Sequence, residues 1–133
     1  MKETIAEINR HYAQTLGEGR RLVMGEGDPH ARLMLVGEAP GAQEAELGRP
    51  FVGTAGKHLD AFLAGVGLAR EALYITNAVK FRPTRTSAKG RLSNRTPTRQ
   101  EIAAFRPWLL AEIKAVQPLV IATLGNTALR AVT

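Results

Sequence analysis

Three short apolar runs, separated from one another by segments with helical periodicity, constrain the fold of this chain more than any other feature. The runs cover residues 32–36, 73–79 and 119–124. They have the length and the apolar character of strands buried in a parallel sheet. Because strands that alternate with helices form parallel βαβ units, the pattern predicts a layered α/β fold.

Helical spacing of apolar residues marks the segments around these runs. The predicted helices cover residues 2–16, 54–66 and 98–116, and a further helix begins at residue 126. Thr54 is a candidate N-cap for the second helix, and Thr98 with Glu101 fits a capping box at the third. Two stretches lack such spacing. They are a glycine-rich connector over residues 17–31, with a short extended piece at 22–24, and a polar loop over residues 81–97.

Length and composition limit the class of protein. The chain has 133 residues, which indicates one domain, and 44% of them are hydrophobic, which is enough for a core. No apolar run reaches the roughly 18 residues that a membrane span needs, and the N-terminus lacks the apolar core of a signal peptide. We therefore expect a cytoplasmic protein. The sequence contains no cysteine, which excludes disulfides and cysteine-ligated metal sites.

Positive charge is concentrated in one segment. The net charge is +6, and residues 80–106 contain eight basic side chains against one acidic side chain, Glu101. A local basic patch is the usual electrostatic mark of a polyanion partner, most often nucleic acid. The alternative is a solvated surface loop that favours solubility.

The turns after the first two predicted strands contain groups that can bind a ligand. In parallel sheets, ligands lie beyond the carboxyl ends of the strands. The sequence GEAPG, residues 37–41, follows the first strand, and its glycines permit a close approach of the backbone to a ligand. Glu38 can orient water or stabilise a developing cation, or it can cap local amides in a purely structural turn.

Two further side chains suit a planar, polar ligand. Phe51 lies in a glycine-flanked loop, where its ring can stack on a base or pack on the adjacent helix. Asn77 lies near the end of the second strand. Its carboxamide can pair with an N–H beside a C=O, an edge that uracil has and cytosine lacks, or it can be satisfied by the backbone. The chain lacks both the GxGxxG fingerprint and a P-loop.

Four segments, taken together and in order, resemble the family 4 uracil-DNA glycosylases of bacteria and archaea. They are GEAPGAQEAELGRPFVGTAG, YITNAVKFRPTR, NRTPTRQEI and PLVIATLGNTA, within residues 25–128. The resemblance implies a three-layer α/β/α sandwich with a central, mostly parallel sheet. It also implies hydrolysis of the N-glycosidic bond of deoxyuridine in DNA after base flipping, with uracil-containing DNA as the partner and no metal at the reaction centre. We expect a monomer.

The resemblance assigns roles to residues of this sequence. Glu38 corresponds to the acid that positions or activates water, and Glu44 to a second functional carboxylate. Backbone N–H groups from Ala39 to Gly41 correspond to donors near the uracil carbonyl. Phe51 corresponds to the ring that stacks on uracil, and Asn77 to the amide that reads its edge. The predicted DNA contacts are Lys80, Arg82, Lys89, Arg91 and Arg95.

The sequence departs from the family at the cysteines of its 4Fe–4S cluster. Two of the four positions are Phe81 and Phe105, and the other two fall near His11 and Gln14. We predict that the cluster is absent and that the two phenylalanine rings pack in its place. Because the cluster is structural in most members, its loss does not exclude activity.

Two other departures concern the end of the chain and the basic loop. The family's last histidine motif is missing, so we expect residues 1–133 to form a single domain that stops before it. A lost donor of that kind costs on the order of 10² to 10³ in rate. The loop of residues 84–95 resembles the insert of a branch that links covalently to the abasic site through a histidine. Because Ser93 stands at that position, we predict no cross-linking.

Two alternative functions remain compatible with the sequence. One is a non-catalytic member that binds uracil-containing or single-stranded DNA, which the missing histidine and the basic loop favour. The other is an α/β enzyme that acts on free nucleosides.

Overall fold

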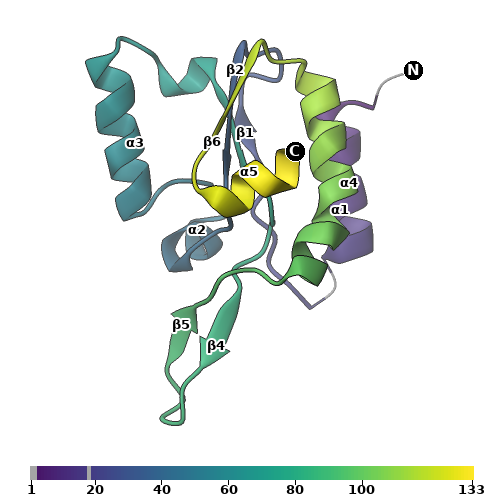
Figure 1. Ribbon diagram of the computed structural model, residues 1–133, viewed down its shortest axis with the longest axis vertical. Coiled ribbons are helices and arrows are strands. Elements are labelled where there is room, and N and C mark those ends of the chain that lie inside the picture. Colours follow the sequence, from purple (N-terminus) through teal and green to yellow (C-terminus); the bar gives the residue numbers. More distant parts are fainter. Residues whose placement is uncertain (1–2, 18) are drawn as a thin grey trace.

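The computed structural model describes residues 3–17 and 19–133, and a four-stranded sheet lies at its centre (Figure 1). The strand order is β1-β3-β2-β6. β2 runs parallel to both of its neighbours, β3 and β6, whereas β1 pairs with β3 in the antiparallel direction. The strands are β1 (Glu26–Gly27), β2 (Leu33–Gly37), β3 (Tyr74–Asn77) and β6 (Val120–Thr123). The prediction of a central, mostly parallel sheet is confirmed.

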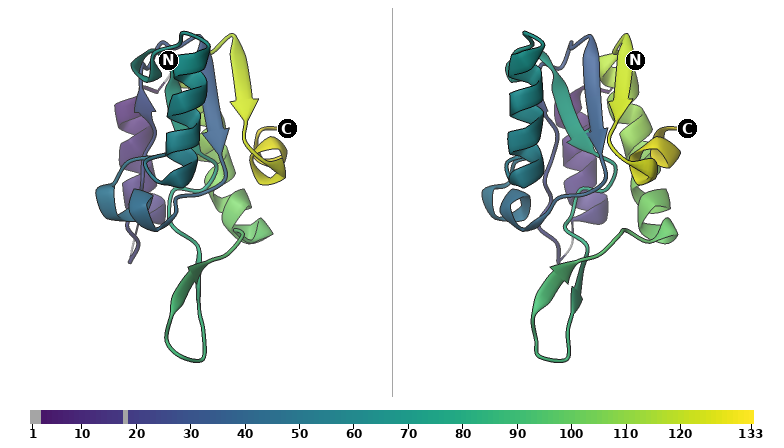
Figure 2. Two further views of the ribbon diagram at one scale, coloured as in Figure 1. Left: turned by 90° about the vertical axis from the view of Figure 1, so that its left-hand side faces the viewer. Right: turned by 60° about the vertical axis from the view of Figure 1, so that its left-hand side comes forward.

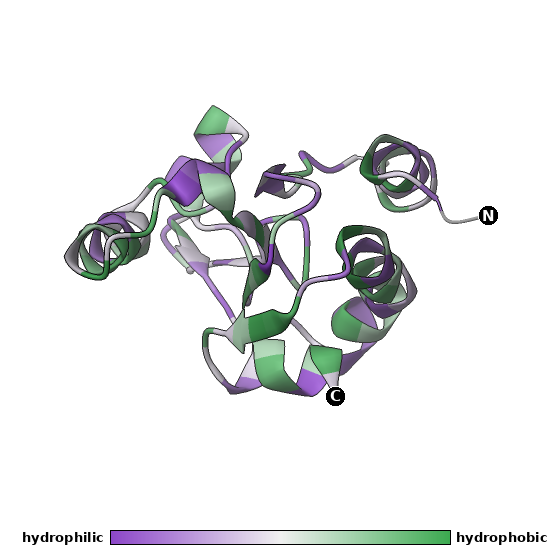
Figure 3. Cartoon of the chain, turned by 90° about the horizontal axis from the view of Figure 1, so that it is seen from above, coloured by the Kyte–Doolittle hydropathy of each residue, from purple (hydrophilic) through white to green (hydrophobic). Residues whose placement is uncertain are grey.

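Helices cover both faces of this sheet, which gives the three layers expected for the family (Figures 1 and 2). One face carries α3, and the other carries α4 and α5, with α1 beside α4. Seen from above, α3 lies opposite the pair of α1 and α4, with the strands between them (Figure 3). The helices are α1 (Ile5–Leu16), α3 (Thr54–Gly65), α4 (Arg99–Val116) and α5 (Asn126–Val132).

The alternation of side chains along β2 builds a core on each face. Met34 and Val36 pack in the cluster that contains Leu109 of α4. Leu35 packs with Leu63 of α3 in the cluster on the other face. Successive residues of a strand point to opposite faces, so this apolar strand supplies both cores.

Several predicted boundaries shift because capping residues set them. α1 begins at Ile5, because the Thr4 hydroxyl accepts a hydrogen bond from the Glu7 N–H and caps the helix, and the predicted start at residue 2 lies outside the described residues. The N-cap of α3 is Gly53, so the prediction that Thr54 caps this helix is wrong. The capping box at α4 is confirmed, because Thr98 and Glu101 exchange hydrogen bonds of 2.8 and 3.1 Å.

The structure also contains elements that the sequence pattern did not indicate. A short helix, α2 (Ala42–Leu47), follows the GEAPG turn. The predicted basic loop contains a hairpin of β4 (Thr84–Thr86) and β5 (Leu92–Asn94), which projects from the body of the molecule (Figure 1). The extended piece expected at 22–24 is not a strand, and β1 lies just after it. A single 3₁₀ turn (Arg70–Ala72) precedes β3 and delays its start to Tyr74.

None of the helices in the described ranges is both long and apolar enough to cross a membrane.

Candidate functional site

A cavity of about 480 Å³ opens beyond the carboxyl ends of β2 and β3. Gly37 and Asn77, the last residues of these two strands, are partners in the parallel register. Most of the residues predicted for ligand binding lie around this cavity, together with one that was not predicted, Asn94. The residues that line it include Ala39, Gly41, Glu44, Phe51, Asn77 and Asn94.

Phe51 and Asn77 converge over Gly37. A Cβ atom placed on Gly37 would overlap both the Asn77 Oδ1 atom and the Phe51 Cζ atom. Glycine is therefore needed at this position to let the ring and the amide come together. Asn77 is only 3% exposed, and among the described residues its one hydrogen bond with a side chain goes from Lys80 to its backbone carbonyl, while its carboxamide lines the cavity. Its polar atoms are therefore available to a molecule in the cavity.

The loop that carries Phe51 is held by Arg70, a residue that sequence reasoning missed. Arg70 Nη1 donates to the Phe51 carbonyl at 2.8 Å, and Nη2 donates to the Pro50 carbonyl at 2.5 Å. Asp60 and Glu26 accept further hydrogen bonds from the same guanidinium. Phe51 has a φ of 53°, in the left-handed region that a bulky residue rarely adopts. The bonds from Arg70 hold the backbone in this conformation.

Glu38 lies at the boundary of a second cavity, of about 560 Å³, which shares Ala39, Phe51 and Asn77 with the first. The Glu38 carbonyl accepts a hydrogen bond from the Val79 N–H at 3.1 Å, so the turn is attached to the segment that follows β3. The Glu38 side chain is half-buried. The rest of this cavity is mostly apolar and includes the exposed His58.

Glu44 joins the GEAPG turn to the Phe51 loop. Its Oε1 atom accepts a hydrogen bond from the Gly41 N–H at 3.1 Å, and Oε2 accepts from Val52 and Gly53 at 2.9 and 2.6 Å. Burial acts to raise the pKa of this carboxyl, but the backbone donors outweigh it, so the pKa lies below its ordinary value. These bonds give Glu44 a positioning role at the edge of the cavity.

Lys80 was predicted to contact DNA, and that prediction does not hold, because its side chain is completely buried. Its ammonium donates to the Thr76 hydroxyl at 2.6 Å and to the Asn77 carbonyl at 2.5 Å. The Glu112 carboxylate of α4 lies 2.5 Å away. Lys80 is thus a core residue directly beneath Asn77 and cannot reach a phosphate outside.

The carboxylate that pairs with Lys80 has two further partners. The hydroxyls of Tyr12 and Tyr74 donate to Glu112 at 2.6 and 3.1 Å. Burial and the neighbouring carboxylate raise the pKa of both tyrosines, so they remain protonated donors. Burial lowers the pKa of Lys80, while Glu112 acts in the opposite direction. Every charge in this buried group has a partner, as a stable buried ion pair requires.

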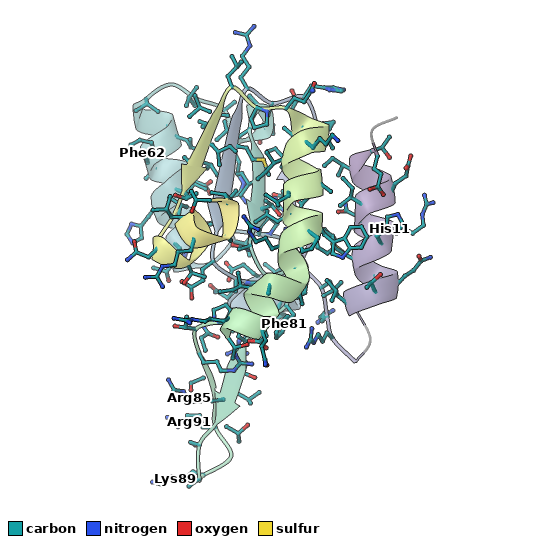
Figure 4. The ribbon with its side chains drawn as sticks, turned by 45° about the vertical axis from the view of Figure 1, so that its right-hand side comes forward. His11, Phe62, Phe81, Arg85, Lys89 and Arg91 are labelled. Atoms are coloured by element: carbon teal, nitrogen blue, oxygen red, sulfur yellow. The ribbon has the colours of Figure 1, made fainter. Side chains whose placement is uncertain are left out.

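The other predicted DNA contacts fall into two groups. Lys89 and Arg91 are exposed on the hairpin, and so is Arg85, which was not among the predicted contacts (Figure 4). Arg82 and Arg95 lie nearer the body of the protein and already have protein partners. Arg82 Nε donates to the Asn94 side chain at 2.7 Å, and Arg95 makes two hydrogen bonds, of 2.7 and 2.9 Å, to Glu101.

Aromatic side chains occupy the region where the family's cysteines would converge. The rings of Phe81 and Phe105 have centroids 5.9 Å apart, and Tyr12 lies at the same distance from Phe105. His11 stacks on Trp108 at 5.0 Å. The expected packing of the two phenylalanines is confirmed. These residues do not fit a 4Fe–4S cluster, because they supply no thiolate and their rings pack together in a buried cluster.

The geometry of the site suits a flat molecule with adjacent donor and acceptor groups. An aromatic ring supplies a stacking surface, a buried amide supplies both a donor and an acceptor, and a carboxylate lies close by. The basic hairpin beside the cavity adds an attraction for anions. Within the described ranges, no group of three or more histidine, aspartate or glutamate side chains is placed to hold a metal ion.

Comparison with known proteins agrees with this arrangement. The sequence model of the Uracil DNA glycosylase superfamily matches residues 24–133. A Type-4 uracil-DNA glycosylase of Thermotoga maritima is 47% identical over 108 residues, which cover 81% of this chain and 52% of the relative. A second Type-4 enzyme, from Pyrobaculum aerophilum, is 43% identical over 112 residues, covering 84% of this chain and 53% of the relative.

A more distant match is a Type-5 uracil-DNA glycosylase of Thermus thermophilus. It is 33% identical over 126 residues, covering 84% of this chain and 53% of the relative. The chain thus spans about half the length of the curated relatives it matches.

Proposed function

The chain belongs to the uracil-DNA glycosylase superfamily, and on that premise we propose that it hydrolyses the N-glycosidic bond between uracil and deoxyribose in DNA. Base excision of this kind is a DNA-repair reaction. The base must leave the stack to be reached, so the substrate is a flipped deoxyuridine. The observation that carries the proposal is the convergence of Phe51 and Asn77 over Gly37.

In the proposed complex, the uracil ring stacks on Phe51 and pairs with the Asn77 carboxamide. A carboxamide can pair with an N–H beside a C=O, an edge that uracil has and cytosine lacks. Because the Asn77 amide lines the cavity and has no protein partner among the described residues, a base that fills the cavity but cannot pair leaves these polar atoms without a hydrogen bond. Such a loss typically costs about 1–3 kcal/mol.

The proposed chemistry separates two charges. The sugar becomes cation-like while uracil leaves as an anion, so the transition state needs a negative group near the sugar and donors near the base. We assign the first role to Glu38, which also orients water, and the second to the backbone N–H groups from Ala39 to Gly41. Glu44 supports both of these roles, because its hydrogen bonds hold the GEAPG turn to the Phe51 loop.

The proposal includes the setting of the reaction. The partner is uracil-containing DNA, which the exposed cations of the hairpin attract through its phosphates. We propose a monomer without an iron–sulfur cluster, in which the aromatic packing around Phe105 takes over the structural role of the cluster. We propose a cytoplasmic location, because the Type-4 relatives of Thermotoga maritima and Pyrobaculum aerophilum come from cells whose DNA lies in the cytoplasm.

A second candidate is a non-catalytic member that binds uracil-containing or single-stranded DNA. The observation that favours it is the exposed basic hairpin, whose cations Arg85, Lys89 and Arg91 can bind DNA phosphates without any catalytic group. Binding without release of the base distinguishes this candidate from the glycosylase.

A uracil-release assay tests the proposal. The substrate is an end-labelled oligonucleotide with one uracil, either single-stranded or paired opposite guanine, and alkali reveals the abasic sites. We expect cleavage by the unmodified chain and a loss of at least 100-fold for Asn77→Ala. The matched control is Asn9→Ala, which removes a carboxamide from α1 that does not line either cavity.

The outcomes separate the candidates. Cleavage that Asn77→Ala abolishes and Asn9→Ala retains supports the glycosylase. Tight binding of uracil-containing DNA without cleavage supports the non-catalytic member. Absence of both cleavage and selective binding contradicts the two proposals together.

A further inference from the structure

Asn94 lines the candidate uracil cavity, although it belongs to the basic hairpin. It is the last residue of β5, and it shares the cavity wall with Gly41, Phe51 and Asn77. Unlike Asn77, it is exposed, so it lies at the rim of the cavity. Asn94 is neither one of the pocket residues nor one of the DNA-binding cations to which a role has been given.

Arg82 fixes the orientation of the Asn94 amide. Arg82 Nε donates to the Asn94 Oδ1 atom at 2.7 Å, so the carbonyl end of the amide faces the guanidinium. The other end, Nδ2, lies 3.5 Å from the position that a Cβ atom would take on Gly41. The two N–H donors of Asn94 are therefore presented at the rim, beside the GEAPG turn.

The base of the hairpin is attached firmly enough to hold this geometry. Asn94 pairs with Thr84 across the hairpin. Arg95 Nε donates to the Thr84 carbonyl at 3.0 Å, and its Nη atoms bind Glu101 at the start of α4. Asn94 thus lies between two residues, Thr84 and Arg95, that are tied to the body of the protein.

The chemistry of this pair matches an anion better than a neutral base. Arg82 is permanently charged, and its two Nη groups make no hydrogen bond within the described part of the chain. Together with Asn94 Nδ2 they form a set of donors that make no hydrogen bond with a described residue, and the nearby Glu44 Oε1 atom is already an acceptor for the Gly41 N–H. Hydrogen bonds from such donors to a charged oxygen are the strong ones, and phosphate oxygens receive most protein–DNA hydrogen bonds.

We propose that Arg82 and Asn94 form a subsite for the phosphodiester group of the flipped nucleotide. This inference rests on the proposed function, because only a nucleotide whose base fills the cavity brings its phosphate to the rim. Asn77 reads the base inside the cavity, and the subsite holds the backbone outside it. Arg82 has two roles here: it binds the phosphate and it orients the Asn94 amide.

A chemical double-mutant cycle tests the subsite. The probe is a fluorescent oligonucleotide with one 2′-fluorinated deoxyuridine, which resists cleavage because fluorine disfavours the cation-like sugar. Two further probes carry a neutral methylphosphonate in place of the phosphate on one or the other side of that nucleotide. We expect Asn94→Ala to weaken binding of the all-phosphate probe about 10-fold, which corresponds to one charge-assisted hydrogen bond.

The methylphosphonate probes identify the contact. With the probe whose methylphosphonate replaces the contacted phosphate, Asn94→Ala is expected to weaken binding less than 2-fold, because that probe lacks the charged oxygen that Asn94 would bind. Asn94→Asp keeps the size of the side chain and its bond to Arg82 but removes the donors, so we expect a loss larger than that of Asn94→Ala. Ser93→Ala, on the same strand but outside the cavity, is the matched control and is expected to bind like the unmodified protein.

Three results would overturn the subsite. The first is a 10-fold loss of affinity on Asn94→Ala with both methylphosphonate probes. The second is weaker binding of free uracil by Asn94→Ala, which would show that Asn94 contacts the base. The third is unchanged binding by Asn94→Ala while the protein still prefers uracil over thymine in the probe. Equal binding of uracil and thymine probes by the unmodified protein contradicts the proposed function itself and, with it, the subsite.

Discussion

Lys80 and Lys89 belong to one basic segment of the sequence, yet they lie in opposite environments. Lys80 is completely buried, and its ammonium has three oxygen partners within 2.6 Å. Lys89 is exposed at the tip of the hairpin, far from the sheet (Figure 4). The first holds the end of β3 under the candidate site, and the second is placed to meet a polyanion.

The difference shows that the charge of a segment does not predict the role of each charge within it. A cation can be buried only where a carboxylate and other acceptors are already in place. Lys80 meets this condition because Glu112 comes from α4 and the backbone of β3 lies beside it. The hairpin cations have no such surroundings and stay in water.

The largest effect is expected from Lys80→Met, which leaves Glu112 as an uncompensated buried charge. Breaking a buried pair in this way typically costs about 3–5 kcal/mol in the free energy of unfolding. Urea denaturation of the variant measures this loss. Lys89→Met is the matched control, and it is expected to change the stability by less than about 0.5 kcal/mol because its side chain is exposed.

A second variant tests whether the loss comes from the unpaired carboxylate. Glu112→Gln added to Lys80→Met removes the remaining charge and keeps an acceptor for the hydroxyls of Tyr12 and Tyr74. We expect the double variant to recover at least half of the stability lost by Lys80→Met. Equal costs for Lys80→Met and Lys89→Met would remove the distinction between the two environments.

Removal of charge from the hairpin is expected to have the opposite effect to Lys80→Met. It should weaken DNA binding strongly and leave the free energy of unfolding unchanged. Replacing Arg85, Lys89 and Arg91 by glutamine removes three exposed charges from it. Each lost phosphate contact lowers the slope of log Kd against log salt concentration by about 0.7–0.9, so we expect a total decrease of about 2–3. Fluorescence anisotropy with labelled DNA over a range of salt concentrations measures this slope.

The control for the hairpin variant removes three exposed cations elsewhere, through Arg10→Gln, Arg32→Gln and Lys114→Gln. It changes the net charge by the same amount, so a decrease in slope that equals that of the hairpin variant would contradict a hairpin-specific contact.

Arg95 and Glu101 are less buried than Lys80 and less exposed than Lys89. Among the predicted effects, we expect the smallest from a substitution in this pair. The pair is partly buried, and it joins the hairpin to the capping box of α4. Glu101→Gln weakens both the ion pair and the cap, so we expect a loss of about 1 kcal/mol in the free energy of unfolding. Glu7→Gln, in the first turn of α1, serves as the control for a simple loss of charge near a helix start.

The same pair predicts a pH dependence. The hydrogen bonds from Arg95 lower the pKa of Glu101 to about 2 from its ordinary value of 4.5. A lowered pKa in the folded state gives a stabilisation that is complete above pH 4.5 and is lost as the pH falls toward 2. The stability difference between the unmodified chain and Glu101→Gln should therefore shrink over this range. A difference that stays constant from pH 6 to pH 3 would contradict the role of the pair.

The layered fold was predictable because its signals are local. The runs at β2, β3 and β6 are short and mostly apolar, and the capping box at Thr98 is contained within four positions of the chain. α2 and the hairpin were missed because six residues, or two strands of three, are too short to establish a period. Their positions follow from contacts with other segments.

The candidate site was predictable in part. The resemblance to the family pointed to Phe51 and Asn77, and the structure brings both over Gly37. It gave no indication of Arg70, which holds the Phe51 loop from a 3₁₀ turn before β3. Asn94 was missed as well, because nothing in the sequence around it shows that the hairpin folds back to the cavity.

Local patterns in the chain were thus sufficient for the alternation of the three main strands with helices, and the resemblance to the family indicated Phe51 and Asn77 in the pocket. Folding in three dimensions settled which cations are buried and which face water, and which loops meet at the cavity. The reason is that the environment of a charged or polar side chain depends on partners distant in sequence, as Lys80 depends on Glu112 and Asn94 on Arg82. Periodicity reports only on neighbours along the chain.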